Sequence, residues 1–399
     1  MNKFAIITPT YIEHFKFIVP YLASIDKYVK DKDCFVLYFI ICENEFTNFS
    51  KLIKDFPGIN IRVIGFESLL KKYDVQYTPE ELFKRYDKFT YQTLKKLYAI
   101  LDMPEEECLI IDSESMFISE VSVSDLFNNN RVHKTLIYSD ISKRARCAEF
   151  FKSLVVTHSQ LLNIPKLWFL EHVNWFFEKK IVVDIVNELG SPIEIAERAL
   201  EISKNNLESD RHVFEGLLYY GWIYKHRQDY DYKIYDLDQE LKSRLTVEDL
   251  KEYDKRFYKK FSGQAGRLEF ALSLLNNKNV DAIIQLYRDL NIQILRCETT
   301  TIRTITSQSK LIDELKVKLL TCSQNHAYGL NKEHVFKTVV VDPPKLQKHL
   351  QNLKPTCNFF KLIVKQLSEI VIILLLLLKI PFSALIFYLK QLNSLHRYY

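Results

Sequence analysis

The segment CLIIDSESMFI, residues 108–118, brings together an expected core element and an expected site. Its apolar run ends at two carboxylates, Asp112 and Glu114, which one serine separates. A short apolar run bounded by turn residues is typical of a strand buried on both faces of a parallel sheet. The two acids therefore follow a core strand, where they either serve a ligand or simply meet water.

Three further runs have the same character: KFAIIT at 3–8, CFVLYFIIC at 34–42 and NIRVIGF at 60–66. Segments of helical length, 13–29 and 46–55, lie between them. Strands that alternate with helices predict an α/β domain with a mostly parallel central sheet covered on both faces. Ligands of such sheets bind at the carboxyl ends of the strands, so the residues after each run are the candidates for a site.

The segment FTYQTLKKLYAIL, 89–101, is expected to form a helix before the strand that ends at Asp112. One apolar face follows the helical period and consists of Leu94, Leu97, Tyr98 and Leu101. Gln92 and Lys96, four residues apart, are expected together on the opposite side. A lysine there could neutralise a diphosphate as a point charge, or it could belong to an ordinary solvated face.

Composition narrows the classes of function. The chain has 399 residues, 47% of them hydrophobic, enough for two compact domains or one large domain with appendages. A net charge of +5, without a basic and aromatic stripe, argues against nucleic acid as a partner. The low count of eight glycines argues against glycine-rich phosphate loops, and the nucleotide-binding P-loop, dinucleotide and nucleophile-elbow motifs are absent.

Seven cysteines show no Cys-x-x-Cys pair and no metal-ligand spacing, which favours a reducing compartment. The N-terminal apolar run is too short for a secretory signal, so we expect a cytoplasmic body. Residues 370–389 approach the ~20 apolar residues of a membrane span. Lys379 and Pro381 interrupt them, and basic residues flank them, which favours a helix lying on the membrane surface over a full span. The alternative is a hairpin packed on the protein itself.

The expected organisation has four parts. Residues 145–235 are aromatic-rich and predicted to be mostly helical, including PKLWFLEHVNWFFEKK at 165–180, and residues 240–325 are predicted to form charged amphipathic helices. The four parts are an α/β domain at 1–235, a helical extension at 236–340, a linker at 341–355 and an apolar C-terminal segment at 356–399.

Several residues could take part in binding. An acid-x-acid pair at a strand end suits Mg²⁺ or Mn²⁺, which uses few protein ligands and completes its shell with phosphates. Thr8, Thr10 and Tyr11, in TPTY after the first strand, could bind a ribose or base edge or form an ordinary turn. Glu43, in ENE after the second strand, could accept hydrogen bonds from a ribose or base, or lie in a solvated loop.

The expected base is Glu215, in the apolar and aromatic stretch VFEGLLYYGWIY. Partial burial would raise its pKa toward the range useful for general base catalysis. It could instead be a structural carboxylate paired with Arg211, four residues earlier. Glu171, Glu178 and His172 are rival candidates within a segment that is more simply explained as an amphipathic helix, and the lone His158 is more simply structural.

In their order along the chain, TPTY, YQTLKKLYAIL, LIIDSESMFI and FEGLLYYGWIY resemble bacterial GT-A-type glycosyltransferases. The likeness is to a family of capsule and lipopolysaccharide transferases with a glutamine-rich helix and a Leu-Asp-x-Asp-type strand, and it covers about residues 1–235. The resemblance implies a GT-A-like nucleotide-sugar-binding domain.

Carried over residue by residue, the resemblance makes Asp112 and Glu114 the ligands of Mn²⁺ or Mg²⁺, places Gln92 and Lys96 near the donor, and makes Glu215 the catalytic carboxylate. Glu114 replaces the commoner Asp, which lengthens that ligand by one methylene.

Phe214 and Gly216 differ from the residues that the family has beside its acid, which makes the role of Glu215 less secure than that of the acidic pair.

The implied activity is transfer of a sugar from a nucleotide-sugar donor to a glycan or lipid-linked acceptor, at the cytoplasmic face of the inner membrane. Two alternatives stay open: a nucleotidyl- or phosphotransferase on the same type of sheet, and a membrane-tethered assembly subunit that keeps a degenerate sugar-nucleotide fold. The first lacks a glycine-rich, arginine-bearing loop near the first strand. The sequence leaves open the sugar, the base, the acceptor, the linkage and the stereochemical course.

Overall fold

The computed structural model divides the chain into two compact units, Met1–Val339 and Val340–Tyr399, and every described residue belongs to the first unit. The predicted linker and the apolar segment at 370–389 lie outside the described residues. Among the residues described, no helix combines the length and the apolar character needed to cross a membrane. The structure describes residues 4–117, 120–140, 149–169, 175–206, 212–248, 250–251, 285–286, 289–290, 296–297 and 321–323.

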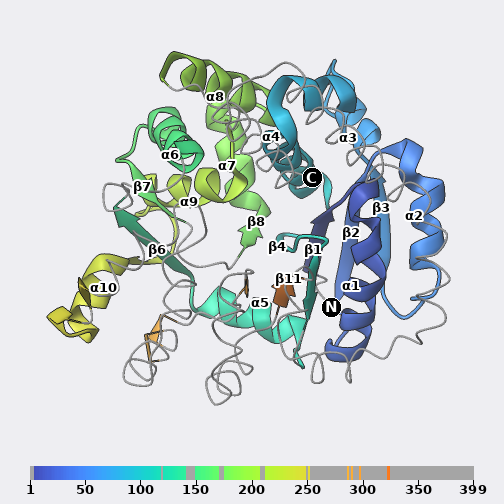
Figure 1. Ribbon diagram of the computed structural model, residues 1–399, viewed down its shortest axis with the longest axis horizontal. Coiled ribbons are helices and arrows are strands. Elements are labelled where there is room, and N and C mark those ends of the chain that lie inside the picture. The colour runs from blue at the N-terminus through green and yellow to red at the C-terminus, as the bar shows by residue number, and fades with distance from the viewer. Residues whose placement is uncertain are drawn as a thin grey trace, which may run out of the picture. The chain divides into compact units, whose positions relative to one another are not determined.

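A five-stranded sheet forms the centre of the first unit, in the order β3-β2-β1-β4-β8 (Figure 1). The first four strands are parallel, and β8 adds an antiparallel edge beside β4. The mixed α/β architecture with a mostly parallel central sheet is therefore confirmed. The strands are β1 (Phe4–Pro9), β2 (Phe35–Ile41), β3 (Ile61–Gly65), β4 (Glu107–Ile110) and β8 (Phe176–Glu178).

The sheet is covered on both faces because successive side chains of a strand point to opposite sides. Along β1, Phe4 and Ile6 join one apolar cluster while Ala5 and Ile7 join another. The helices of the first cluster are α1 (Phe15–Tyr28), α2 (Phe46–Ile53) and α5 (Val123–Val132). Those of the second are α3 (Phe66–Lys72), α4 (Pro79–Asp102), α6 (Glu149–Leu162), α7 (Lys179–Leu189), α8 (Pro192–Asn206) and α9 (Glu215–Lys225).

Helix α4 is longer than the sequence period predicts. It begins at a capping box in which Glu81 N donates to Thr78 Oγ1 over 3.2 Å and Thr78 N donates to the Glu81 carboxylate over 2.8 Å. From Tyr91 to Ile100, every side chain except that of Gln92 is buried, since α4 packs between the sheet and helices α7 to α9. The alternative that Lys96 lies on an ordinary solvated face is therefore wrong.

The segment WFFEKK, predicted to be helical, is partly extended. Phe176–Glu178 forms β8, and Ile110 N donates to Trp175 O over 2.9 Å as the pairing continues past the strand. Leu167–Trp168 is also extended, as β7. An unpaired edge of β4 favours an added strand over a helix for such a short apolar run. Glu171 and His172 lie outside the described residues.

Two smaller sheets complete the unit. One contains β6 (Thr135–Asp140), β7 and β9 (Lys233–Asp236), and helix α10 (Leu237–Arg244) follows β9. The other joins β5 (Ser115–Phe117) to two short pieces, β10 (Arg296–Cys297) and β11 (Thr321–Ser323). The prediction of helices throughout 240–325 is wrong for these two pieces, whose backbones pair with other strands.

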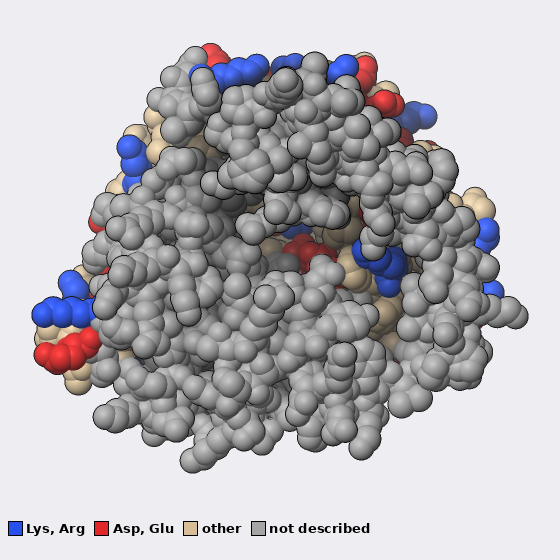
Figure 2. All heavy atoms as spheres, viewed as in Figure 1, with Lys and Arg blue, Asp and Glu red and all other residues tan. Residues whose placement is uncertain are grey.

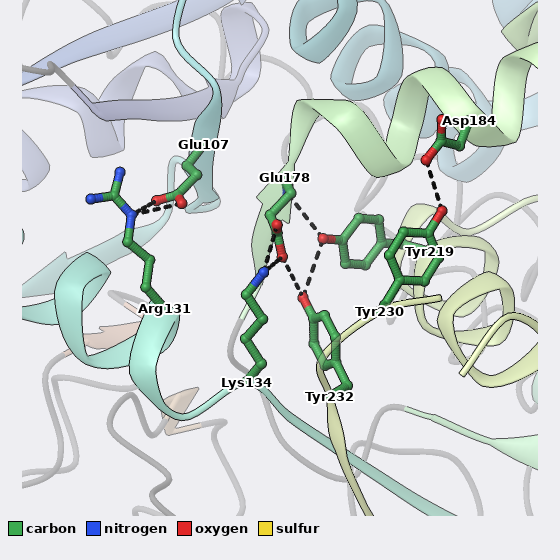
Figure 3. Close-up of polar contacts among 8 residues, drawn as sticks. All are labelled: Glu107, Arg131, Lys134, Glu178, Asp184, Tyr219, Tyr230 and Tyr232. Carbon is green, nitrogen blue, oxygen red and sulfur yellow. Dashed lines mark hydrogen bonds and ion pairs between the residues drawn. The ribbon is translucent and has the colours of Figure 1, made fainter. Parts of the chain in front are cut away.

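Ion pairs join the amino end of β4 to its neighbours (Figure 3). Arg131 Nε lies 2.7 Å from Glu107 Oε1, at the first residue of β4. Lys134 Nζ lies 2.7 Å from both oxygens of Glu178, and Tyr232 OH donates to the same carboxylate over 3.2 Å. Glu107 and Glu178 are paired in register, so this network marks the sheet edge opposite to the one that Asp112 follows.

Candidate functional site

The carboxyl ends of β1 and β4 meet at one edge of the sheet. Ile111 N donates to Ile7 O over 3.0 Å, so the two chains still run side by side where Asp112 begins a turn closed by Ser115 N and Asp112 O at 2.9 Å. Acidic and basic side chains lie next to one another near the centre of the face shown in Figure 2. A ligand of a parallel sheet is expected at this edge.

Three of the predicted site residues meet here, although they come from distant parts of the sequence. Lys96 Nζ lies 2.6 Å from Glu215 Oε1 and 3.6 Å from Asp112 Oδ1. The side chains of Lys96 and Glu215 are 5% and 1% exposed, whereas that of Asp112 is 21% exposed. The lysine thus joins a fully buried carboxylate to a partly open one.

Glu215 is the first residue of α9, where the positive end of the helix dipole favours a carboxylate. Its second oxygen, Oε2, accepts a hydrogen bond from Thr93 Oγ1 over 2.8 Å. Both oxygens therefore have partners on α4. Arg211, the partner considered from the sequence, lies outside the described residues, and Lys96 is the cation found beside Glu215.

The backbone before Glu215 is held by side chains of α4 and α6. The amides of residues 212 and 213 donate to Thr90 Oγ1 over 3.2 and 3.3 Å. Phe214 N donates to His158 Nε2 over 3.2 Å, and His158 Nδ1 donates to Leu154 O over 2.6 Å. Burial lowers the pKa of His158 to about 4, so the ring is neutral with its proton on Nδ1. The geometry gives His158 a structural role.

An aromatic ring adds to the surroundings of the Lys96 ammonium. Its Nζ lies 5.0 Å from the centre of the Trp175 ring, within the range of a cation–π contact. The Trp175 ring in turn packs edge-on against Phe214, with centroids 5.9 Å apart. Two carboxylates and an aromatic face thus fix the position of one buried cation.

Glu114 lies beside a histidine that the sequence did not single out. His14 Nδ1 is 3.0 Å from Ser113 Oγ and 3.4 Å from Glu114 Oε2. The His14 ring packs on that of Tyr11 with centroids 4.2 Å apart, and Lys88 Nζ donates to Tyr11 OH. Burial lowers the pKa of Lys88 and raises that of Tyr11. Only the position of His14 a few residues after a strand end could have drawn attention to it.

The acidic pair suits a metal with few protein ligands. The side chains of Asp112 and Glu114 supply hard oxygen atoms and are 21% and 22% exposed. The described part of the chain contains no group of three His, Cys, Asp or Glu side chains suited to a metal. Mg²⁺ binds through one or two carboxylates and takes its other ligands from water and substrate phosphates, so the two acids fit such an ion.

The remaining predicted donor-binding residues are spread along the same edge. The hydroxyl of Thr8 points into the core, 3.3 Å from Tyr21 OH. Glu43, after β2, accepts a hydrogen bond from Ser68 Oγ over 2.5 Å. Gln92 is half-buried on α4. Their roles in binding stay predictions.

Lys95 is a second buried cation that the sequence reasoning missed. It is 2% exposed, its Nζ lies 3.3 Å from Thr10 O, and within the described ranges it has no ion pair. The Tyr91 and Phe66 rings lie 4.9 and 5.6 Å from the ammonium, and burial lowers the pKa of Lys95. Thr10 Oγ1 is buried beside it without a described hydrogen-bond partner. The available signal was the Lys-Lys doublet inside the helix expected at 89–101.

No protein-family model matches the chain, and no curated protein matches it significantly. Among solved structures, mouse xyloside xylosyltransferase 1, apo form, is 10% identical over 66% of this chain and 95% of its own, with a TM-score of 0.35. The galactosyltransferase LgtC, in complex with donor and acceptor sugar analogs, is 12% identical over 54% and 70%, with a TM-score of 0.36. S. aureus TarS is 11% identical over 79% and 54%, with a TM-score of 0.29. At these scores the likeness assigns neither fold nor activity to this chain.

Proposed function

We propose that this protein is a glycosyltransferase that moves a sugar from a nucleotide-sugar donor to a glycan or lipid-linked acceptor in surface-polysaccharide biosynthesis. The observation that carries the proposal is the meeting of Lys96, Asp112 and Glu215 at the carboxyl edge of a mostly parallel sheet. A fixed cation at such an edge suits a ligand whose leaving group gains negative charge, because the charge is met by a group already in place.

The donor would lie across the ends of β1, β2 and β4. Lys96 supplies a positive charge for the diphosphate, and Gln92 lies one turn before it on α4. Thr10 and Tyr11, after β1, and Glu43, after β2, are the proposed contacts for the nucleoside. Thr8 belongs to the same strand end but would act through the core, since its hydroxyl faces Tyr21.

Asp112 and Glu114 would hold the Mg²⁺ or Mn²⁺ ion, which, when bound, supplies positive charge to the donor phosphates. Lys96 contacts Asp112 from the buried side, and His14 contacts Glu114, so each carboxylate is oriented by a neighbour of this chain.

Transfer also requires a group that takes the proton of the acceptor hydroxyl as the hydroxyl oxygen bonds to the anomeric carbon and the diphosphate leaves. Glu215 is the base expected from the sequence, and this assignment stays a prediction. Its carboxylate is 1% exposed and already accepts from Lys96 and Thr93.

We also propose that residues 370–389 bring the enzyme to the cytoplasmic face of the inner membrane, where lipid-linked glycans would be within reach. The support is the sequence alone: an apolar run with lysines at both sides.

Calorimetry with a panel of nucleoside diphosphates, with and without Mn²⁺, tests the proposal. We compare the wild type, the double variant Asp112→Ala/Glu114→Ala, and Glu120→Ala, which removes an exposed acid whose described ion pair is with Lys30. One diphosphate that binds with Mn²⁺ to the wild type and Glu120→Ala, and not to the double variant, supports the donor site. Release of that diphosphate from its nucleotide sugar when acceptor is added supports glycosyl transfer.

A wild-type protein that is folded by circular dichroism and binds none of the nucleotides would contradict the proposal and favour the non-catalytic assembly subunit. Transfer of a nucleotidyl or phosphoryl group to the acceptor would favour the alternative enzyme classes instead.

A further inference from the structure

Both oxygens of the Glu215 carboxylate are hydrogen-bonded to side chains of α4. Its Oε1 lies 2.6 Å from Lys96 Nζ, and its Oε2 accepts from Thr93 Oγ1 over 2.8 Å. With 1% of the side chain exposed, both contacts are made inside the protein. A general base must come within hydrogen-bond reach of the hydroxyl that it deprotonates. Both oxygens of this carboxylate are instead hydrogen-bonded to Lys96 and Thr93.

We infer that Glu215 is a positioning residue, which holds the Lys96 ammonium at the donor diphosphate, and that it does not deprotonate the acceptor. The inference deepens the proposed function and rests on it, because it assigns roles within the same donor site.

The charges support this division of roles. Burial of an ammonium is costly, and a close anion offsets the cost; of the two anions described beside Lys96, Glu215 is the closer, at 2.6 Å against 3.6 Å for Asp112. Asp112 is also the more exposed of the two acids, on the side where a ligand would arrive. Lys96 is therefore anchored from within and faces the sheet edge.

Hydrogen bonds also fix the Glu215 side chain and the backbone before it. Thr90 and His158 hold the amides of residues 212 to 214, and Thr93 holds the carboxylate itself. With Lys96 these side chains make four, and three of them, Thr90, Thr93 and Lys96, lie on one helix, α4. A side chain fixed from so many sides suits a role in which its position is constant during turnover.

A double-mutant cycle between Lys96→Met and Glu215→Gln tests the inference. The probes are the nucleoside diphosphate that the wild type binds best and its parent nucleoside, measured by calorimetry. We expect each single variant to weaken diphosphate binding about tenfold or more while nucleoside binding stays within about twofold. We expect the double variant to be no weaker than the weaker single variant, because residues that act as one unit are not additive.

The alternative makes the opposite prediction. If Glu215 is the base, Glu215→Gln keeps diphosphate affinity and loses about 10²- to 10⁴-fold in kcat at unchanged KM. That result would overturn the positioning role. An additive cycle would overturn it as well.

A matched control exists in the same protein. Lys134 and Glu178 form a second lysine–glutamate pair with a hydroxyl donor, Tyr232, at the opposite end of β4 (Figure 3). Glu178→Gln removes a carboxylate of the same kind from that place, and it should leave diphosphate affinity unchanged. A tenfold loss in this control would show that the effect in Glu215→Gln is a general loss of structure and would overturn the inference.

Thr93→Val keeps the test sharp if Glu215→Gln does not fold. It leaves the charge pair in place and removes the hydroxyl that donates to Oε2 over 2.8 Å and also lies 3.3 Å from Val213 O, so diphosphate affinity should fall about two- to fivefold with nucleoside affinity unchanged. An unchanged diphosphate affinity in folded Thr93→Val would count against the inference. Absence of any diphosphate binding to the wild type would instead refute the proposed function on which the inference rests.

Discussion

Replacing Lys95 by methionine should stabilise the protein, whereas the same change at the next residue should destabilise it. Lys95 is 2% exposed, and its one described hydrogen bond is a 3.3 Å contact with Thr10 O. Methionine fills a similar volume between the Tyr91 and Phe66 rings without a charge. Removal of a buried charge that has no ion pair among the described residues should gain about 1–3 kcal/mol in the free energy of unfolding. Lys96→Met should lose about 3–5 kcal/mol, because Glu215 is left buried without its cation.

The gain at Lys95 should depend on pH, in a direction that the pKa fixes. Burial lowers the pKa of Lys95 in the folded state, so the unfolded chain binds more protons at this position. The wild-type free energy of unfolding therefore rises as pH increases toward the usual lysine pKa of about 10.4. The advantage of Lys95→Met should be largest near neutral pH and shrink as the pH approaches that value.

Urea unfolding at pH 7 and pH 10, followed by circular dichroism, measures both effects. Equal slopes against urea in wild type and variant show that the extent of unfolding is the same. A loss of stability in Lys95→Met, or a gain that is the same at both pH values, would refute the reasoning that the charge of Lys95 is an uncompensated cost.

Three other changes test the supporting structure. Asp31 accepts hydrogen bonds from the Ser124 hydroxyl and from the amides of residues 123 and 124 at the start of α5, and these bonds hold its pKa well below the usual range. Asp31→Asn should cost about 1.5–3 kcal/mol at pH 7, and the wild-type advantage should shrink steadily as the pH falls below about 4. An advantage as large at pH 2 as at pH 7 would contradict this reasoning. Because burial lowers the pKa of His158 from 6.5 to about 4, the wild-type free energy of unfolding should fall by about 3 kcal/mol between pH 6.5 and pH 4. In urea titrations His158→Gln should lack this dependence on pH, and an equal dependence in both proteins would contradict the assignment. Thr78→Ala should cost about 1 kcal/mol in the same assay through the lost helix cap, and no change would mean that α4 is held by packing alone.

Much of the central sheet could be predicted because its strands are continuous apolar runs between polar turns. The runs at 3–8, 34–42, 60–66 and 108–112 correspond to β1 to β4 within one or two residues. Groups that follow parallel strands meet at one edge of the sheet, so the position of Asp112 at that edge could be predicted as well. Apolar runs of this kind carry their own signal, and they need no knowledge of the rest of the chain.

The partners within the site could not be predicted, since they depend on packing. Glu215 lies 119 residues after Lys96 in the sequence, and no local pattern joins them. The burial of Lys95 and Lys96 follows from the layer of helices that covers α4 on its outer side. Only three-dimensional packing separates a solvated lysine from a buried one on such a helix. The short segment Phe176–Glu178 shows the same limit, because three apolar or charged residues fit a strand and a helix equally well.

Helix α4 places Thr90, Thr93, Lys95 and Lys96 on a single rod of 24 residues that starts at a fixed cap. One residue inserted or removed between the cap and these side chains would turn all of them by about 100° at once. Glu215 would then face a different residue, and the sheet edge would lose both cations together. The protein should thus accept changes of residue type at the exposed positions along the first half of this helix, but no change in its length.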